Sequence, residues 1–229
     1  ILRLQVIRQK TNWLTAWGRY IGVFAIAIFL GYLSSRPQLM CFYDATRTKA
    51  RTLTPNSQEI ISKLKGDLTI TTYVNMLDRN VYYGLSSAVK DDMNRFRMYT
   101  RFKPEIKMKY VYYYDKTNNP TLEQRYPGLT DEQRLKKICD ALDWDVKRVL
   151  TPEQIRAKED LSGEYNKYVR VIERGNGQKS YLRLYEDNYR HPTETEISAA
   201  LKRMVIKSPV VAFLTGHGER SIDGIGERD

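Results

Sequence analysis

Hydrophobic and polar positions divide the chain into one long apolar stretch near its start and a series of shorter patterned segments after it. Residues 20–33 carry no charge, and extending the stretch back to Leu14 adds only Arg19. After Arg36 the chain is mostly polar. Because a helix needs about 20 mostly apolar residues to cross a bilayer, the pattern predicts one transmembrane helix over residues 14–35.

The flanks of this stretch also fit a membrane helix. Aromatic residues suited to the bilayer interface lie on both sides of it: Trp13, Trp17, Tyr20 and Tyr32. A cleaved signal peptide and a buried core helix are the alternatives. The signal peptide is disfavoured because bulky Tyr32 and Leu33 stand where a cleavage site needs small residues. Small residues in the stretch leave room for packing against a partner helix: Gly22, Ala25 and Gly31.

Basic residues flank the stretch on both sides, so charge alone leaves its orientation open. The positive-inside rule counts short flanks and largely ignores long translocated domains, and here the N-terminal flank is the short one. We therefore expect a cytoplasmic segment at residues 1–13, a connector at 36–52 and an extracytoplasmic domain at 53–229. The chain stops in a Gly-rich stretch, without the helix that its last predicted strand would feed. We expect the domain to be C-terminally incomplete, in a fragment of a longer protein.

The first half of the domain is predicted to contain a helix, a strand, a second helix and a second strand, in that order. Thr54 is a helix N-cap, Pro55 suits the first helical position and Gly66 can end the helix. Apolar residues alternate over 67–75, which predicts a strand, and the tyrosine-rich segment 105–115 is predicted to be a second strand. Between them, five positions follow helical spacing and predict a helix over 85–100: Leu85, Ala88, Val89, Met93 and Phe96. A strand–helix–strand unit of this length favours a parallel pair.

The second half begins with a turn-rich segment at 116–130 and continues with helices and a hairpin. Helices are predicted over 130–144, after the capping box of Thr151 and Gln154, and after that of Thr193 and Glu196. A hairpin is predicted over 168–186, and an apolar strand over 209–214. Together the elements predict an α/β domain with a mostly parallel sheet and flanking helices, flavodoxin-like or related.

Charge and cysteine content exclude two classes of site. The net charge of +11 falls to +7 when the four basic residues of 1–35 are set aside. The remaining basic residues are interleaved with acidic ones and form no aromatic–basic stacking motif, so we expect no nucleic-acid partner. Cys41 and Cys139 have no metal-ligand spacing. We expect two unpaired thiols, with Cys139 buried on a helix face, and keep a disulfide as the alternative.

One cluster has catalytic character, in the loop that follows the predicted strand at 209–214. It consists of Thr215, Gly216, His217, Gly218 and Glu219. His217 could act as a general base or metal ligand beside Glu219, but the only other histidine is His191. The sequence also lacks a phosphate-binding loop, a nucleophile elbow and a dinucleotide fingerprint. We expect a structural loop that contacts a ligand or partner, with no metal and no cofactor. The tyrosines at 110–114 are expected to be a half-buried strand.

Two stretches of the chain resemble a known family. They are Arg-Thr-Leu-Thr-Pro-Asn-Ser at 51–57, continued by the strand at 68–74, and Val-Ala-Phe-Leu-Thr-Gly-His-Gly-Glu at 211–219. Both are similar to the extracytoplasmic domain of gliding-motility-type ABC-transporter auxiliary proteins of Bacteroidetes. The resemblance implies a non-catalytic accessory subunit in the cytoplasmic (inner) membrane, with a single span and a periplasmic domain. Its implied partners are an ABC permease and a separate ATPase subunit.

Two other functions stay open at this point. A membrane-anchored extracytoplasmic hydrolase would use the loop at 215–220, and loss of turnover without loss of fold in His217→Ala would support it. A purely structural envelope protein would not co-purify with an ATPase and a permease. The accessory subunit, linked to gliding motility or envelope transport, is the leading hypothesis.

Overall fold

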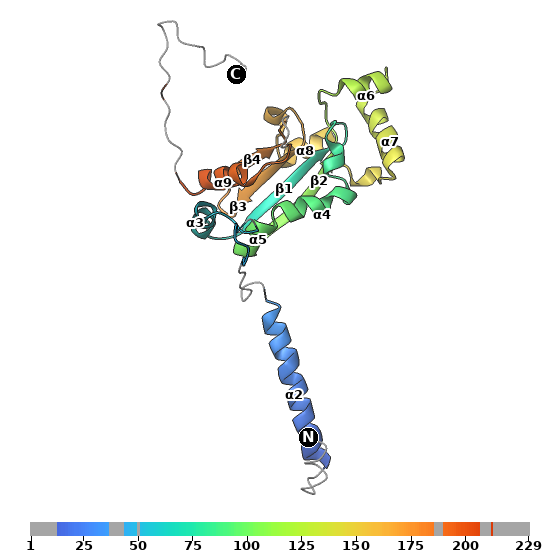
Figure 1. The fold of residues 1–229 in the computed structure, drawn as a ribbon. Coiled ribbons are helices and arrows are strands. Elements are labelled where there is room, and N and C mark those ends of the chain that lie inside the picture. The colour runs from blue at the N-terminus through green and yellow to red at the C-terminus, as the bar shows by residue number, and fades with distance from the viewer. Residues whose placement is uncertain (1–12, 37–43, 50, 186–189, 207–211, 213–229) are drawn as a thin grey trace.

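A computed structural model describes residues 13–36, 44–49, 51–185, 190–206 and 212 (Figure 1). Its strands are β1 (Leu68–Asn75), β2 (Ile106–Tyr113), β3 (Val169–Arg174) and β4 (Lys179–Arg183). Its α-helices are α2 (Trp13–Ser34), α3 (Pro55–Lys63), α4 (Ser86–Arg95), α5 (Arg97–Phe102), α6 (Pro120–Arg125), α7 (Asp131–Leu142), α8 (Pro152–Lys158) and α9 (Glu194–Arg203). Short 3₁₀ helices are η2 (Val81–Tyr83), η3 (Val146–Arg148) and η4 (Ser162–Glu164).

Helix α2 is the apolar helix that the sequence predicts. Within it, the 18 residues Trp17–Ser34 are long and apolar enough to cross a membrane, a test that a signal sequence near the N-terminus would also pass. None of this window is buried against the rest of the described chain, and Figure 1 draws the helix apart from the sheet. Just after the helix, the Arg36 guanidinium lies 4.1 Å from the centre of the Tyr32 ring.

The four strands form one mixed sheet in the order β2-β1-β3-β4. β1 and β2 are parallel, with Leu68 opposite Ile106, as the strand–helix–strand pattern predicts. β3 is antiparallel to β1, and β4 is antiparallel to β3. The expectation of a mostly parallel, flavodoxin-like sheet is therefore wrong, because two of the three strand pairs in the described chain are antiparallel.

The direction of β3 follows from the connection that precedes it. The chain leaves β2 and passes through α6, α7 and α8 without a helix that returns it to the opposite end of the sheet (Figure 1). It therefore enters β3 at the end where β1 and β2 finish. The turn at 175–178 then joins β3 to β4 as the predicted hairpin, in which Gly177 has φ +83°. The predicted strand at 209–214 lies outside the described residues, apart from the isolated residue Ala212.

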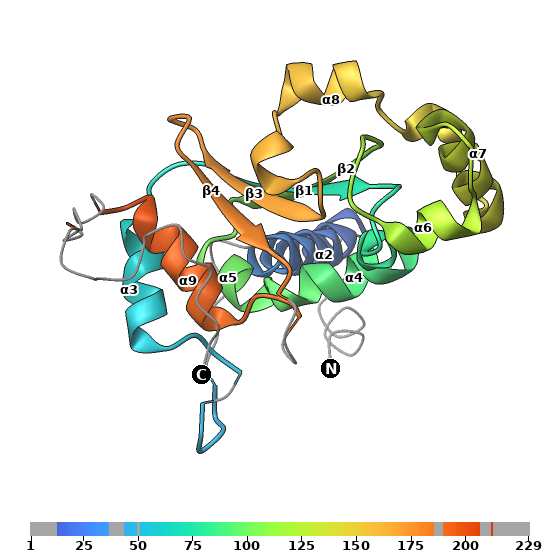
Figure 2. The same ribbon diagram turned by 90° about the horizontal axis from the view of Figure 1, so that it is seen from above.

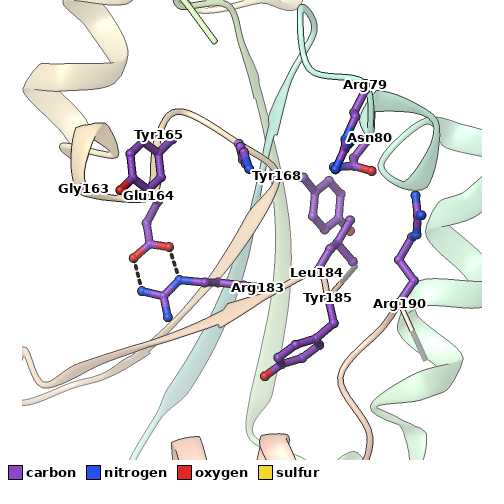
Figure 3. A pocket seen from close by; sticks show the side chains of 11 residues that line it. Arg79, Asn80, Gly163, Glu164, Tyr165, Tyr168, Arg183, Leu184, Tyr185 and Arg190 are labelled. Carbon is purple, nitrogen blue, oxygen red and sulfur yellow. Dashed lines mark hydrogen bonds and ion pairs between the residues drawn. The ribbon is translucent and has the colours of Figure 1, made fainter. Parts of the chain in front are cut away.

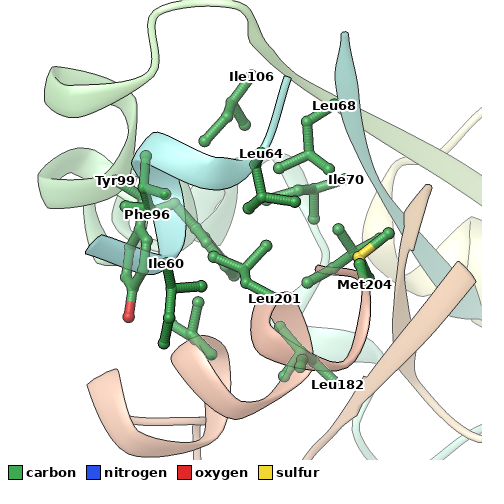
Figure 4. Close-up of a cluster of buried hydrophobic side chains, with 14 of the residues drawn as sticks. Ile60, Leu64, Leu68, Ile70, Phe96, Tyr99, Ile106, Leu182, Leu201 and Met204 are labelled. Atoms are coloured by element: carbon green, nitrogen blue, oxygen red, sulfur yellow. The ribbon is translucent and has the colours of Figure 1, made fainter. Parts of the chain in front are cut away.

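Helices α3, α4, α5 and α9 cover one face of the sheet, and α8 lies over the other (Figure 2). The face under α3, α5 and α9 holds the main apolar cluster, which joins these three helices to all four strands (Figure 4). Its buried members include Leu64, Leu68, Ile70, Phe96, Tyr99, Ile172, Leu201 and Met204. A second cluster lies beyond the carboxyl end of β1 and includes Val74, Leu135, Cys139 and Tyr168. The tyrosine-rich strand β2 is half-buried as predicted, with Tyr113 fully buried.

Helices α3 and α9 lie side by side and run in the same direction. At their starts, Thr54 donates from its backbone N–H and its hydroxyl to Oε1 of Glu194, both at 2.8 Å. One turn later the hydroxyls of Ser57 and Ser198 are 2.7 Å apart. At their ends, Arg174 of β3 donates to the carbonyls of Lys65 and Met204, at 3.1 and 2.8 Å. Polar contacts therefore fix the register of the two helices along their whole length.

Local capping signals place the helices correctly. The side chain of Thr54 accepts from the backbone N–H of Ser57, and Gly66 ends the segment at φ +85°. Capping boxes start α7 at Thr130, α8 at Thr151 and α9 at Thr193. Each of these predicted helices is confirmed, as is the burial of Cys139.

Two segments differ from expectation. The helix predicted over 85–100 is two helices, α4 and α5, that meet at Phe96. Met93 is 46 % exposed, and its neighbour Asp92 is buried in its place because it pairs with an arginine of the sheet. The turn-rich segment at 116–130 contains α6, which starts where the Asn119 side chain accepts from the N–H of Leu122.

Candidate functional site

A pocket of about 350 Å³ opens at the end of the sheet where β1 finishes, and we call it the strand-end pocket (Figure 3). Ligands of open α/β sheets bind beyond the carboxyl ends of parallel strands. Three segments build the pocket: the loop after β1, the loop before β3, and the end of β4 with the residues that follow it. Its described lining residues are Arg79, Asn80, Gly163, Glu164, Tyr165, Lys167, Tyr168, Arg183, Leu184, Tyr185 and Arg190.

The loops around the pocket are held by the buried side chain of Asn75, the last residue of β1. Its Nδ2 donates to the carbonyls of Asp115 and Asn166, both at 2.8 Å. Its Oδ1 accepts from the backbone N–H of Leu77 at 3.0 Å. One side chain thus ties together the loops that follow β1 and β2 and the loop that precedes β3. Because these bonds are directional, they fix the positions of the three loops beside the pocket.

The loop before β3 is held in an uncommon backbone conformation. Tyr165 and Asn166 both have positive φ, at +54° and +50°, which is disfavoured for residues with a Cβ. The carbonyl of Tyr165 accepts from the hydroxyl of Thr117, and the Asn166 side chain donates to the carbonyl of Lys116. These bonds keep the Tyr165 ring three-quarters exposed at the pocket, 6.0 Å from Nζ of Lys167. Strain held in this way is typical of binding loops.

The charge of the described pocket lining is predominantly positive. It includes four cations, Arg79, Lys167, Arg183 and Arg190, and one acid, Glu164. Glu164 is paired with Arg183, whose Nη2 lies 2.6 Å from Oε1, and this contact raises the pKa of Arg183. By sequence, the chain between Tyr185 and Arg190 contains two more acids, Glu186 and Asp187, which lie outside the described residues.

Behind the pocket, an ion pair is buried between β3 and α4. Arg170 is fully buried and donates from Nη2 and Nε to the carboxylate of Asp92. The hydroxyl of Tyr110 donates to Oδ2 of the same carboxylate at 2.8 Å, and burial raises the pKa of Tyr110. The guanidinium lies 4.9 Å from the ring centre of Tyr168 and 5.8 Å from that of Phe96. It therefore stands where the two apolar clusters meet.

His191 connects the ion pair with the pocket rim. Its Nδ1 lies 3.4 Å from Nη2 of Arg170, and its ring makes an edge contact with Tyr83 at 4.9 Å. Burial and the nearby cations Arg95 and Arg170 lower the pKa of His191 from 6.5 to about 4. The imidazole is therefore neutral at pH 7, and its Nδ1 accepts the hydrogen bond from the guanidinium. Arg190, a pocket residue, lies 5.9 Å from the Tyr83 ring.

The chemistry that this arrangement offers is binding. Arginine and lysine hold carboxylate or phosphate groups through charge-assisted hydrogen bonds, and tyrosine rings supply flat apolar surface. Among the described lining residues there is no serine or cysteine beside a base, which nucleophilic catalysis would require. No group of three or more His, Cys, Asp or Glu residues suited to a metal ion occurs in the described part of the chain.

The site residues predicted from the sequence lie elsewhere. Thr215, Gly216, His217, Gly218 and Glu219 are outside the described residues, so the ligand or partner loop stays a prediction. On α2, Gly22 and Ala25 lie on one side of the helix and Gly31 on the opposite side, since nine residues correspond to two and a half turns. No described atom of another segment would meet a Cβ at Gly22 or Gly31, and the packing role stays a prediction.

Cys139 is a free, buried thiol on α7, as the sequence predicts, and burial raises its pKa. Cys41 lies outside the described residues.

Sequence reasoning did not identify the strand-end pocket, because its residues come from three segments far apart in the chain. One signal pointed to it. Arg170 stands beside the apolar residues Val169, Val171 and Ile172 in β3, and a charged residue in such a run needs a partner. That partner is Asp92, which lies behind the pocket.

Comparison with known proteins yields no relative: no protein-family model, no curated protein and no solved structure matches the chain.

Proposed function

We propose that this chain is a membrane-anchored accessory subunit of an ABC transport system that works by binding and coupling, without covalent chemistry. Its partners would be a permease and a separate ATPase subunit, in a system for envelope transport or gliding motility of Bacteroidetes. In this proposal α2 crosses the inner membrane once, and the folded domain lies in the periplasm.

One observation carries the proposal: a membrane-length helix is joined to a domain whose strand-end pocket is lined by cations and tyrosines. Residues of these types hold ligands or partner surfaces, and the resemblance of residues 51–57 and 211–219 supplies the link to transport. The strand-end pocket would be the contact for a carboxylate- or phosphate-bearing substrate or for an acidic partner segment.

Co-purification tests the proposal. The natural protein that contains this chain is tagged in its own cell, extracted in mild detergent and recovered with its associated proteins. We expect an ABC permease and an ATPase in stoichiometric amounts. Recovery of the intact protein without either of them would contradict the proposal and favour a structural envelope protein.

Matched variants in α2 separate anchoring from docking. Gly22→Leu with Ala25→Leu fills the side of α2 on which small residues allow close helix packing. We expect this double variant to stay in the membrane but to lose most of its permease. Ile21→Leu with Ile26→Leu keeps the bulk of the helix surface and should retain the permease. Equal recovery from both variants would show that this side of α2 makes no contact with the permease.

Matched variants in the domain address the strand-end pocket. Lys167→Gln with Arg190→Gln removes two of its cations, whereas Lys136→Gln with Lys137→Gln removes two exposed cations on α7. We expect transport to fall in the first variant and to be unchanged in the second.

His217→Ala should leave complex assembly and transport intact, and loss of a hydrolytic turnover in that variant would favour the hydrolase.

A further inference from the structure

A second hollow, of about 480 Å³, lies at the other end of the domain, between the connector and α5. One wall is the connector loop, described at residues 44–49 and 51–52, and the other is α5. The described residues that line it are Asp44, Ala45, Thr46, Arg51, Thr52, Met98, Arg101 and Phe102. The two walls are joined by a hydrogen bond of 3.2 Å from Nη1 of Arg101 to the carbonyl of Arg51.

Covalent connectivity keeps this hollow close to the membrane-length helix. Seven residues, 37–43, separate Arg36 at the end of α2 from Asp44 in the connector loop. A chain of that length spans at most about 28 Å even when fully extended. If α2 crosses a bilayer, Asp44, which lines the hollow, therefore lies within about that distance of the end of the membrane helix. This limit holds on whichever side of the membrane the domain lies.

The surface around the hollow is strongly basic. Arg47, Lys49 and Arg51 are exposed on the connector loop, and Arg97 is exposed on α5, one turn before Arg101. Asp44 is the one acidic residue among the described residues that line the hollow. Its carboxylate accepts from the N–H and hydroxyl of Thr46 and from the N–H of Arg51. These bonds lower the pKa of Asp44 and engage both of its oxygens within the loop.

An apolar side chain stands at the edge of the same surface. Phe102, the last residue of α5, is 41 % exposed, although most large apolar residues of the domain are buried. Met98, one turn earlier, is partly buried and packs against the main apolar cluster. Exposed aromatic residues beside cations are typical of segments that lie at the interface of a bilayer.

We propose that this surface docks onto an anionic lipid bilayer, with a lipid headgroup phosphate in the hollow and the Phe102 ring at the interface. The connector-end surface consists of Arg47, Lys49, Arg51, Arg97, Arg101 and Phe102. Each lysine or arginine near an anionic membrane raises the local affinity about fivefold, and the short connector keeps these cations at high effective concentration near the surface.

Docking would fix the orientation of the whole domain. The strand-end pocket lies beyond the opposite end of β1 from α5 (Figure 1). With the connector-end surface on the bilayer, that pocket would face away from the lipid. The proposal does not depend on the identity of the transport partners.

Hydrogen exchange of the full chain in nanodiscs tests the proposal. One set of nanodiscs contains only phosphatidylcholine, and the other contains about one third phosphatidylglycerol. We expect amide exchange in residues 44–52 and 97–102 to be at least threefold slower in the anionic nanodiscs, and high salt to abolish the difference because it screens exposed charges. Equal exchange in both kinds of nanodisc would overturn the proposal.

Two charge-matched variants make the test specific. Arg47→Gln, Lys49→Gln and Arg97→Gln together remove three exposed cations without touching Arg101, which holds the loop to α5. Lys136→Gln, Lys137→Gln and Arg148→Gln remove three exposed cations at the far end of the domain. Only the first variant should lose the protection. Equal loss in both would show a non-specific charge effect and overturn the proposal.

A last measurement separates lipid from free anion. Inorganic phosphate is added at millimolar concentration to the chain in phosphatidylcholine nanodiscs. No change in the exchange of 44–52 is expected, because the proposed binding needs a surface of many charges. Full protection by phosphate alone would show that the hollow binds a soluble anion, and would overturn bilayer docking.

Discussion

The amino end of β1 packs in the main apolar cluster, against α3, α5 and α9. At the carboxyl end of the same strand, the side chain of Asn75 forms hydrogen bonds with the surrounding loops. The first end is held by close packing of many side chains, such as Leu68 and Leu201. The second end packs in the second apolar cluster, and there the side chain of Asn75 adds directional bonds that fix three loops. Packing stabilises a fold broadly, while directional bonds specify local shape. The two ends of one strand thus differ: apolar packing dominates at the connector end, whereas the far end combines packing with side-chain bonds that hold the loops beside the strand-end pocket.

The largest effect is expected at Arg170, where the two apolar clusters meet. Asp92→Ala would leave a fully buried guanidinium without its carboxylate, which should lower the free energy of unfolding by about 3–5 kcal/mol. Urea denaturation of the full chain in detergent, followed by circular dichroism, measures the loss.

The control for this prediction replaces both charges, as Asp92→Leu with Arg170→Met. Because no charge is then buried, the double variant should be far closer to the parent protein. If the double variant were as unstable as Asp92→Ala, lost packing rather than an unpaired buried charge would explain the effect. The Asp92–Arg170 ion pair would then have no special role between the two apolar clusters.

The next largest effect concerns the packed end. Leu201→Ala on α9 removes a buried side chain from the main apolar cluster and should cost about 3 kcal/mol, because the cavity is only partly filled by relaxation. Hydrogen exchange should quicken in α3 and α9 and stay unchanged in residues 115–117. Faster exchange at both ends of β1 alike would show that the ends are not separate.

Asn75→Ala tests the hydrogen-bonded end. The substitution leaves the carbonyls of Asp115 and Asn166 and the N–H of Leu77 without their partner, at an expected cost of about 2–3 kcal/mol. Here exchange should quicken at residues 115–117 and 165–168, while α3 and α9 remain protected. Leu201→Ala and Asn75→Ala should therefore show opposite patterns of hydrogen exchange. The same pattern in both variants would contradict the proposed difference between the two ends of β1.

A smaller, pH-dependent effect is expected from His191. Folding lowers its pKa from 6.5 to about 4, so between these values the unfolded chain binds a proton that the folded protein does not. The free energy of unfolding should therefore fall as the pH falls from 6.5 to 4, by at most about 1.4 kcal/mol per pH unit. His191→Gln, which keeps an acceptor but does not titrate, should flatten this part of the profile. An identical profile in the variant would contradict the assignment.

The smallest effect is expected at the pocket rim. Glu164→Gln breaks the ion pair with Arg183, whose side chain is largely exposed, and such pairs contribute less than about 1 kcal/mol. Stability in urea should change little, although the pocket lining gains positive charge. A loss as large as that of Asn75→Ala would show that the ion pair helps to hold the loops beside the pocket.

Features encoded within a few residues were predictable from the sequence. The capping boxes at Thr130, Thr151 and Thr193 and the Gly-rich hairpin turn each satisfy backbone groups locally, so they start or end elements whatever the rest of the chain does. The same holds for the parallel pair of β1 and β2, which a single helical crossover dictates. Most of the elements and their order follow from such signals.

Features that depend on distant partners were not predictable in this way. Asp92 lies on the buried side of α4 because Arg170, 78 residues later, pairs with it, and this places Met93 outside. The direction of β3 depends on where the chain stands after α8, which no local pattern records. The strand-end pocket is lined by three segments that are far apart in the sequence, so no local pattern predicts it.

The parallel arrangement of α3 and α9 has a mechanical consequence. Among the described helices of the domain α3 is the first and α9 the last, so tension between residues 53 and 206 would pull the two helices past each other along their length. The contacts of Thr54 with Glu194, of Ser57 with Ser198, and of Arg174 with both helix ends would then resist together rather than one after another. The force path would run through this helical layer and bypass the strand-end pocket, which would keep its shape under strain.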